Sequence, residues 1–362
     1  MNKYTVKLGT QSYPVITGSS TLKQLKNEIK RQNLYKNIFV VVDENVKKLH
    51  TGKILEAFDS GYNKVNYYLL KQGEKSKSTV ELNNIYTKLL EKSYGRDTLI
   101  IGMGGGVTGD LAGYAASSYM RGVQLVHIPT TLLADVDSSV GGKTGINFKN
   151  KKNLIGTFFQ PKLVLIDTDF LHTLPEEEFR SGIGEIIKYS FLTNKKFYNF
   201  VFKSIDKINP GNKTILNKII SESVQFKSSV VAFDEKENDL RKILNFGHTF
   251  AHAYESATNF RIKHGESVTA GIISALYLSN LSGLLQKKEL DIFLGNLSGL
   301  KLPVIIKKVR LQKLLELMYH DKKAGEGKIK FVLLSEVGKI FTDYESSSEE
   351  ILESIKLTFK YI

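Results

Sequence analysis

The chain has 362 residues, of which 41% are apolar and 24% charged, so it is long enough for one large or two ordinary domains and is not a disordered chain. It contains no cysteine, which excludes disulfides, iron–sulfur clusters and cysteine nucleophiles and leaves His, Asp and Glu as metal ligands. The formal charge is +14, but only 7 of the 51 basic residues are Arg, and the scattered lysines form no basic run of about five residues. We therefore expect a small anionic ligand and no nucleic acid.

No part of the sequence resembles a membrane span or a secretory signal. No apolar run approaches the 18 residues of a transmembrane helix, and the first residues lack an apolar signal core. We therefore expect a cytoplasmic protein with no membrane partner.

The first half alternates strand-like and helix-like segments. Residues 38–42 read Ile-Phe-Val-Val-Val, which is typical of a buried parallel strand, and Asp43 follows them. Similar runs occupy residues 65–70, 98–102, 123–129 and 163–167. Amphipathic stretches such as residues 78–92 separate these runs. The alternation predicts a Rossmann-like α/β domain with a mostly parallel sheet over residues 1–175.

The sequence changes character after about Pro175. Apolar residues recur with helical periodicity in residues 176–193, 213–229, 247–258 and 266–285. Few runs resemble strands, although residues 328–334 fit a short one. We expect residues 176–362 to form an all-α C-terminal domain.

A glycine-rich turn joins the strand at residues 98–102 to a predicted helix over residues 107–118. Gly104, Gly106 and Gly109 fit the pattern G-x-G-x-x-G, in which glycines let the backbone approach a diphosphate and the helix N-terminus supplies free N–H groups. Glycines also occur where a chain merely turns tightly, so the pattern alone does not establish a dinucleotide site.

The acidic residues around this turn are unusually placed. In an ordinary dinucleotide-binding unit the ribose-binding acid follows the glycines by about 20 residues, whereas Asp43 precedes them. Asp43 would reach the adenosine ribose if its strand lies beside the glycine-bearing strand. Asp110 lies inside the turn, where its carboxylate would repel a diphosphate. We therefore expect Asp110 to contact a ribose or the nicotinamide, or to cap the helix.

The second half contains candidate metal ligands. Glu185 lies on a predicted helix, His248 and His252 are one helical turn apart, and His264 follows. The His pair resembles H-E-x-x-H, but Thr249 occupies the general-base position, which argues against a zincin protease. Two His and one Glu would leave positions on a divalent metal open for substrate oxygens. The spacing leaves open whether the second imidazole is His252 or His264, and a single histidine is more often an ordinary core or surface residue.

Six blocks of residues are distinctive: 104–113 (GGGVTGDLAG), 129–147 (PTTLLADVDSSVGGKTGIN), 184–188 (GEIIK), 244–253 (LNFGHTFAHA), 264–266 (HGE) and 321–323 (DKK). Together and in this order they resemble the 3-dehydroquinate synthases, a sugar-phosphate cyclase family of the shikimate pathway. The resemblance covers essentially the whole chain, although residues 148–152 depart from the family's usual His-Pro-containing segment.

The resemblance implies cofactors and functional residues. It implies one divalent metal, usually zinc and alternatively cobalt, on Glu185, His248 and His264. It implies NAD bound by Asp43, Glu74, Lys77, Gly104, Gly105, Gly106, Asp110, Thr130 and Thr131. The implied catalytic residues are Asp137, Lys143, Lys188, Asn245 and His252. The implied substrate-binding residues are Arg121, Lys152, Asn153, Lys227, Arg241 and Lys323. The family further implies a homodimer, in which Arg121 reaches the phosphate site of the neighbouring subunit.

The family's substrate, 3-deoxy-arabino-heptulosonate 7-phosphate, carries a carboxylate and a phosphate, which the implied lysines and arginine would neutralise. The implied reaction yields 3-dehydroquinate and phosphate through transient oxidation by NAD, phosphate elimination, re-reduction, ring opening and aldol closure. The metal would act as a Lewis acid. Asp137 or His252 would relay the hydroxyl proton, and the substrate phosphate itself would take the carbon-bound proton.

Three alternatives compete with this interpretation. Polyol dehydrogenases such as glycerol-1-phosphate dehydrogenase share the glycine turn and the metal but would release NADH, and their substrates carry at most one anionic group. Other sugar-phosphate cyclases, whose substrates lack a carboxylate, have less use for Arg241 and Lys227. A basic binding module without activity would leave the His and Glu residues unexplained.

Overall fold

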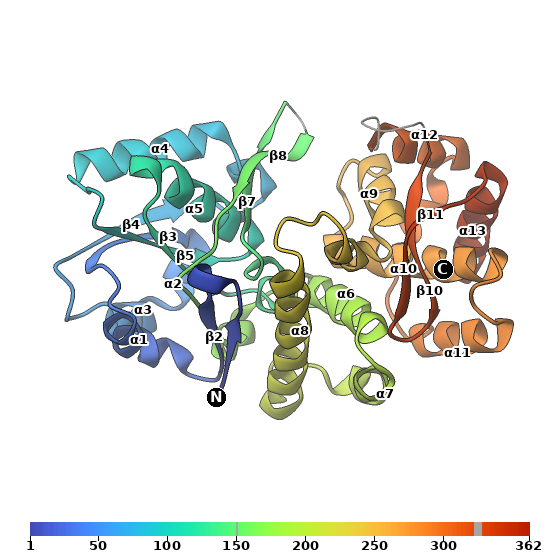
Figure 1. Ribbon diagram of the computed structural model, residues 1–362, viewed down its shortest axis with the longest axis horizontal. Helices are drawn as coiled ribbons and strands as arrows, with labels where there is room; N and C mark the ends of the chain where they lie inside the picture. Colours follow the sequence, from blue (N-terminus) through green and yellow to red (C-terminus); the bar gives the residue numbers. More distant parts are fainter. Residues whose placement is uncertain (150, 322–327) are drawn as a thin grey trace. The chain divides into compact units, whose positions relative to one another are not determined.

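The computed structural model describes residues 1–149, 151–321 and 328–362. The chain divides into two compact units, one made of Met1–Pro175 and Lys207–Lys236 and the other of Glu176–Asp206 and Glu237–Ile362 (Figure 1). The first break falls after Pro175, where the sequence changes character. Residues 207–236, which the sequence analysis placed in the second domain, belong to the first unit because α8 (Lys213–Phe233) packs against β1 (Asn2–Val6) and β2 (Tyr13–Gly18).

The first unit is built on a seven-stranded sheet with the order β1-β2-β9-β6-β5-β3-β4. Its remaining strands are β3 (Asn37–Asp43), β4 (Lys64–Leu70), β5 (Thr98–Gly104), β6 (Gln124–Pro129) and β9 (Leu163–Asp167). Neighbouring strands are parallel except β1 and β2. The mostly parallel sheet and its five predicted strands are confirmed. β1 and β2 were not predicted; β1 is an edge strand whose residues are mostly exposed, so its sequence lacks a buried apolar run.

Helices cover both faces of this sheet (Figure 1). Leu25 and Ile29 of α1 (Leu25–Arg31) and Ile54 of α3 (Thr51–Ala57) belong to the apolar cluster on one face. Ile85 of α4 (Thr79–Glu91) and Leu111 of α5 (Gly106–Ser118) belong to the cluster on the other. Burial on both faces explains why the central strands are continuous apolar runs.

Shorter elements complete the first unit. The chain adds α2 (Glu44–Leu49) and an antiparallel hairpin of β7 (Lys143–Phe148) and β8 (Lys151–Phe158), which was not predicted because β8 is exposed along almost its whole length. The short helices of this unit are Gly9–Gln11, Thr21–Gln24, Glu74–Ser76, Tyr119–Arg121, the π-helical Ala134–Ser138 and Thr168–Thr173.

The second unit is mostly helical, as the sequence predicts. It contains α6 (Glu176–Leu192), α7 (Lys195–Ser204), α9 (His248–Ala257), α10 (His264–Leu281), α11 (Lys287–Leu297), α12 (Leu311–Asp321) and α13 (Ser348–Tyr361). It also contains the hairpin of β10 (Lys330–Glu336) and β11 (Lys339–Glu345) and the short helices Ile205–Lys207, Leu240–Asn245 and Val304–Lys308. The buried α10 packs against α6, α9 and α13 and is the centre of this unit.

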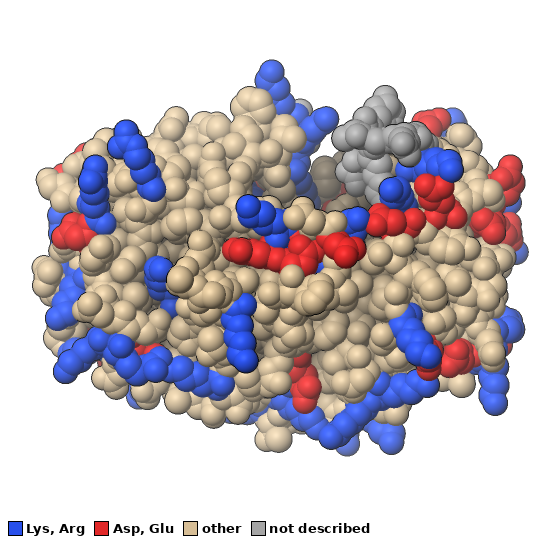
Figure 2. Space-filling view, viewed as in Figure 1, with Lys and Arg blue, Asp and Glu red and all other residues tan. Residues whose placement is uncertain are grey.

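Basic side chains are dispersed over the face of the protein shown in Figure 2. Figure 2 shows Lys and Arg side chains scattered singly and in small groups between uncharged residues on the visible face. Among the helices that the structure describes, none has the length and apolar composition needed to cross a membrane.

Candidate active site

The glycine turn lies between β5 and α5 in the first unit. No described side chain caps α5, whose N-cap is Gly105. A Cβ at Gly104 would lie 2.5 Å from Thr108 Oγ1, one at Gly105 would lie 3.1 Å from Thr131 Cγ2, and one at Gly106 would lie 3.2 Å from Ser138 Oγ. A Cβ at Gly104 would force Thr108 to move, whereas Thr131 and Ser138 leave little space at Gly105 and Gly106. The N-terminus of α5, which no described side chain caps, offers N–H groups to an anion.

The strand that ends at Asp43 lies beside the glycine-bearing strand, which is the arrangement that a contact of Asp43 with the adenosine ribose requires. This strand, β3, pairs in parallel with β5, with Val42 opposite Met103. Asp43 therefore lies at the same edge of the sheet as the glycine turn. Asp43 Oδ1 accepts hydrogen bonds from the backbone N–H groups of Asn45 at 2.9 Å and Val46 at 3.2 Å. Burial raises the pKa of Asp43 above its usual value, although these two bonds oppose the shift.

Asp110 is paired with a buried lysine. Lys77, which is only 5% exposed, forms an ion pair with Asp110 and donates a hydrogen bond to Asn153 Oδ1. Burial raises the pKa of Asp110, and the positive charge of Lys77 opposes that shift. The ion pair compensates the carboxylate, which removes the expected repulsion of a diphosphate. Asp110 does not cap α5, so that alternative is wrong.

Asn147 joins these residues to the β7–β8 hairpin. Its Nδ2 donates to Glu74 Oε1 at 2.7 Å, and its Oδ1 accepts from the backbone N–H of Asn153 at 2.9 Å. Its backbone N–H donates to the carbonyl of Lys77 at 2.9 Å. Asn147 was not among the site residues predicted from the sequence. Its place at the end of the 129–147 block was the available signal.

Two threonines follow β6 beside the turn. The backbone N–H of Thr130 donates to the carbonyl of Gly104 at 3.0 Å. Within the described ranges, the buried Oγ1 of Thr130 has no hydrogen-bond partner. Thr131 Oγ1 accepts from the N–H of Ala134 at 3.2 Å. An unpartnered buried hydroxyl beside an open helix N-terminus fits a polar ligand such as a dinucleotide.

Asp137 and Lys227 are bonded to each other within the first unit. Lys227 on α8 donates to Asp137 Oδ1 at 2.6 Å and to its carbonyl at 2.9 Å, and Lys227 is buried. In this structure the positive charge of Lys227 is therefore compensated by Asp137.

Three further residues of the first unit with implied catalytic or substrate-binding roles are exposed. Lys143 and Lys152 lie at exposed positions of β7 and β8. Arg121 is exposed in a strained segment, where Met120, Arg121 and Gly122 have φ values of 51°, 66° and 117°. Lys323 lies outside the described residues.

Three side chains converge in the second unit. Glu185 comes from α6, whereas His248 and His264 are the first residues of α9 and α10. One ligand atom from each lies within 4.8 Å of the others. Glu185 Oε1 lies 3.6 Å from His248 Nε2 and 3.3 Å from His264 Nε2. His252 is exposed, with its ring centroid 5.6 Å from that of His248. Of the two alternatives that spacing left open, the structure brings His264 into the cluster.

The pKa values of the two histidines in this cluster are shifted in opposite directions. Burial, reinforced by the positive charge of Lys188, lowers the pKa of His248 to about 3. Burial also disfavours charge on His264, but hydrogen bonds to Glu185 and Glu255 outweigh it and raise the pKa to about 10. Lys188 Nζ lies 2.5 Å from Glu185 Oε2, and both residues are buried. Lys188 therefore contacts Oε2 of Glu185, whereas the distances to the two histidines are to Oε1.

The donor set suits a divalent metal of the zinc type. Two imidazole nitrogens and one carboxylate oxygen are the usual protein ligands of a zinc site that keeps a position open. Proteins use imidazole and carboxylate ligands for zinc and cobalt alike. The residues of this cluster therefore fit such an ion.

Glycines next to the three ligands allow the helices to approach closely. A Cβ at Gly184 would lie 2.0 Å from the carbonyl oxygen of Gly265, and a Cβ at Gly265 would lie 1.7 Å from that of Ser181. A Cβ at Gly271 would lie 2.2 Å from the carbonyl oxygen of Gly247, whose φ is +78°. Each ligand is thus adjacent in sequence to a glycine at a backbone contact. These glycines were not predicted to shape the site, although the sequence shows them next to the candidate ligands.

The remaining predicted residues of the second unit lie in the short helix Leu240–Asn245. Arg241 is buried, with 1% of its surface exposed. Asn245 Nδ2 donates to Glu237 Oε1 at 3.0 Å.

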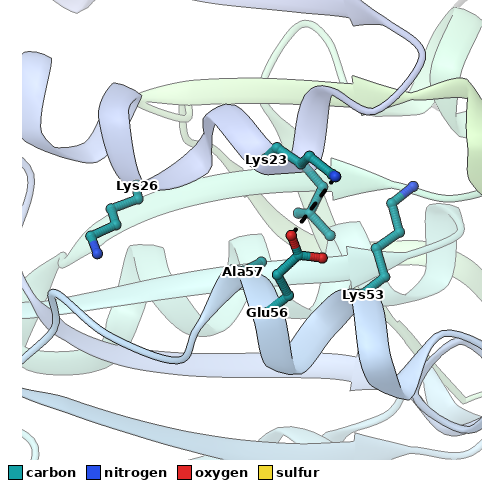
Figure 3. Close-up of a pocket in the computed structure, with 6 residues that line it drawn as sticks. Lys23, Lys26, Lys53, Glu56 and Ala57 are labelled. Atoms are coloured by element: carbon teal, nitrogen blue, oxygen red, sulfur yellow. Dashed lines mark ion pairs between the residues drawn. The ribbon is translucent and has the colours of Figure 1, made fainter.

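A separate small pocket opens in the first unit between α1 and α3 (Figure 3). Its volume is about 100 Å³, and Lys23 and Glu56 at its rim form an ion pair at 3.8 Å. Lys26 donates to Ser60 outside the pocket. Pockets for cofactors usually measure roughly 300 to 1,000 Å³, so this one is too small for a dinucleotide.

The chain is similar in sequence to known 3-dehydroquinate synthases. The chain is 41% identical over 343 residues to the 3-dehydroquinate synthase of Pelagibacter ubique, covering 93% of both chains. It is 39% identical to that of Hydrogenovibrio crunogenus, covering 99% of this chain and 100% of the relative.

Solved structures with the same fold include other cyclases. A 2-deoxy-scyllo-inosose synthase in complex with carbaglucose-6-phosphate, NAD+ and Co2+ has a TM-score of 0.88 at 25% identity, covering 98% of this chain and 99% of the other. A 2-epi-5-epi-valiolone synthase from Streptomyces hygroscopicus with NAD+ and Zn2+ has a TM-score of 0.85 at 26% identity, covering 96% and 97%. The family description 3-dehydroquinate synthase N-terminal matches residues 67–181 and its C-terminal counterpart matches residues 182–324. With both halves matched in order and the relatives covered almost end to end, the chain belongs to the 3-dehydroquinate synthase family.

Proposed function

We propose that this protein converts 3-deoxy-arabino-heptulosonate 7-phosphate to 3-dehydroquinate and phosphate, with NAD and one divalent metal as cofactors. The observation that carries the proposal is the convergence of Glu185, His248 and His264 in a chain of this family. The relatives named above are 3-dehydroquinate synthases, and the two cyclase structures contain NAD+ with Co2+ or Zn2+.

The first unit would hold the dinucleotide. The open N-terminus of α5 and the glycines before it suit the diphosphate, and Asp43 lies at the neighbouring strand end for a ribose. Glu74, Lys77 and Asp110 belong to one hydrogen-bonded network beside the turn. When bound, NAD supplies a hydride acceptor that is restored in the same catalytic cycle.

The second unit would hold the metal, which we propose to be zinc with cobalt as a possible replacement. When bound, the ion supplies Lewis acidity toward the substrate oxygens. Lys188 would keep Glu185 oriented, because its ammonium contacts Oε2 while Oε1 is the oxygen nearest to both histidines in their ion pairs. We propose that His252, an exposed residue with its ring centroid 5.6 Å from that of His248, acts on the substrate as a proton relay.

Basic residues would bind the two anionic ends of the substrate. We propose Arg241 for the carboxylate, because a guanidinium can bind it through two parallel hydrogen bonds. We also propose that Lys143, Lys152 and Asn153 of the β7–β8 hairpin contact the substrate, and that Lys323, which is not among the described residues, does so as well. Asp137 would accept the hydroxyl proton, with Lys227 held against its carboxylate.

We also propose that the protein is a homodimer in which Arg121 reaches the phosphate site of the second subunit. The support is its exposure together with left-handed φ values at Met120 and Arg121, which cost free energy and tend to be kept where a residue must project in one direction. Sedimentation of the intact protein tests the dimer.

The test of the activity supplies the heptulosonate phosphate with a substoichiometric amount of NAD and follows phosphate release and NADH absorbance together. Phosphate release far beyond the amount of NAD, without accumulation of NADH, is the expected result. Stoichiometric NADH would instead indicate a polyol dehydrogenase. Turnover only on a heptulose phosphate that lacks the carboxylate would indicate another cyclase.

A further inference from the structure

Glu255 is a buried acid next to the metal cluster that the catalytic assignments leave without a role. It lies on α9 and is only 4% exposed. Its Oε1 lies 2.8 Å from His264 Nδ1, and Ser267 Oγ, one turn further along α10, lies 3.0 Å from the same oxygen. The carboxylate thus faces the imidazole nitrogen that points away from Glu185.

We propose that Glu255 is a positioning residue that prepares His264 to bind the metal. A histidine ligand uses the lone pair of one ring nitrogen, and the partner of the other nitrogen decides which one that is. Because Nδ1 faces Glu255, its hydrogen stays there and Nε2 is directed toward Glu185 Oε1 at 3.3 Å. The negative charge of Glu255 also makes the imidazole a stronger electron donor.

The geometry distinguishes His264 from the other two ligands. His248 Nδ1 lies 3.3 Å from the carbonyl oxygen of Phe246, a neutral acceptor close in sequence. Glu185 is oriented by Lys188. Within the described part of the chain, His264 is the one histidine of the cluster whose second ring nitrogen faces a buried carboxylate, so its orientation depends on a contact between α9 and α10. This inference rests on the proposed metal site.

The test measures the affinity of the metal-free full-length protein for Zn2+ by competition with a chromophoric chelator. Loss of a carboxylate partner to a metal-binding histidine typically weakens binding about 10-fold to 100-fold. We expect Glu255→Gln, which keeps the shape but loses the charge, to lie near 10-fold, and Glu255→Ala to lie near 100-fold. Thermal unfolding of each metal-free variant reports folding separately.

The matched control is Glu28→Gln, because Glu28 is also a largely buried, hydrogen-bonded glutamate, 13% exposed, but lies in the first unit. It should leave Zn2+ affinity unchanged. A role of Glu255 in folding alone predicts reduced thermal stability with wild-type Zn2+ affinity in the folded variants, and that result would overturn the proposal. If the Ala variant does not fold, wild-type affinity in Glu255→Gln overturns it equally. Wild-type protein that binds no Zn2+ would instead refute the proposed function.

Discussion

Replacing Gly265 by alanine should separate two helices that meet through their backbones and so disrupt the metal cluster. The new Cβ would lie 1.7 Å from the carbonyl oxygen of Ser181, whereas a Cβ needs at least 3.0 Å. All three of its nearest heavy atoms belong to the backbone of Ser181, so no side chain can move aside. The helices α6 and α10 must therefore part by about 1.3 Å, the difference between those two distances.

This separation is large compared with what a metal site tolerates. Gly265 follows His264 directly, and His264 Nε2 lies only 3.3 Å from Glu185 Oε1. Metal–ligand distances vary by about 0.2 Å around their preferred values, so a displacement near 1.3 Å removes one ligand from reach. Overpacking of this kind also costs typically about 1 to 3 kcal/mol of folding free energy. We expect the affinity for Zn2+ to fall at least about 10-fold.

The assay measures bound zinc by elemental analysis after dialysis, together with chelator competition and thermal unfolding. Gly295→Ala is the control, because Gly295 lies in the exposed face of α11 and a Cβ there would meet nothing within 4 Å. It should bind zinc normally and be stabilised by about 0.5 to 1 kcal/mol, since alanine favours a helix more than glycine does. Wild-type zinc affinity in Gly265→Ala would refute the argument from close approach.

Three further predictions concern the histidines at the metal cluster, the buried Arg241, and His127, a buried residue of β6. His264→Ala should lose both bound metal and activity, whereas His252→Ala should retain metal and lose activity; elemental analysis showing metal loss only in the His252 variant would contradict the ligand assignment. Arg241→Ala should reduce the specificity constant by roughly 30-fold to 1,000-fold, which corresponds to the loss of a charged contact of about 2 to 4 kcal/mol. The variant should also lose most of the wild-type preference for the substrate over an analogue with a hydroxymethyl group in place of the carboxylate. Equal losses on both compounds would assign Arg241 to the phosphate or to folding. Burial lowers the pKa of His127 from 6.5 to about 4, so below pH 6.5 the unfolded chain binds a proton that the folded chain excludes, and the free energy of unfolding falls as pH drops from 6.5 to 4. This contribution amounts to about 3 kcal/mol, and denaturant titrations of His127→Gln should show that much less acid destabilisation than the wild type; parallel pH profiles would contradict it.

Local sequence patterns were sufficient to predict the central strands of the sheet and the long helices. The run at residues 38–42 and its counterparts were predictable because strands buried on both faces need apolar residues at every position. The edge strand β1 and the exposed β8 were missed for the complementary reason, since their residues are mostly exposed and carry no such run. Likewise, the amphipathic helix at residues 213–233 was predictable as a helix, but its apolar face does not specify which unit it packs against.

By itself, the sequence determined the class of the fold, the glycine turn and the candidate ligands, and the resemblance carried by six ordered blocks of residues indicated the family. The tertiary structure decided what depends on contacts between distant segments: the pairing of β3 with β5 that brings Asp43 to the turn, and the pairing of Lys77 with Asp110. It also brought His264, instead of the locally attractive His252, to Glu185. The physical reason is that the spacing of residues in the sequence fixes which side chains share one face of a helix. A site built from three helices depends in addition on how closely the helix backbones approach. The absence of a Cβ at Gly184 and Gly265 allows this close approach between α6 and α10.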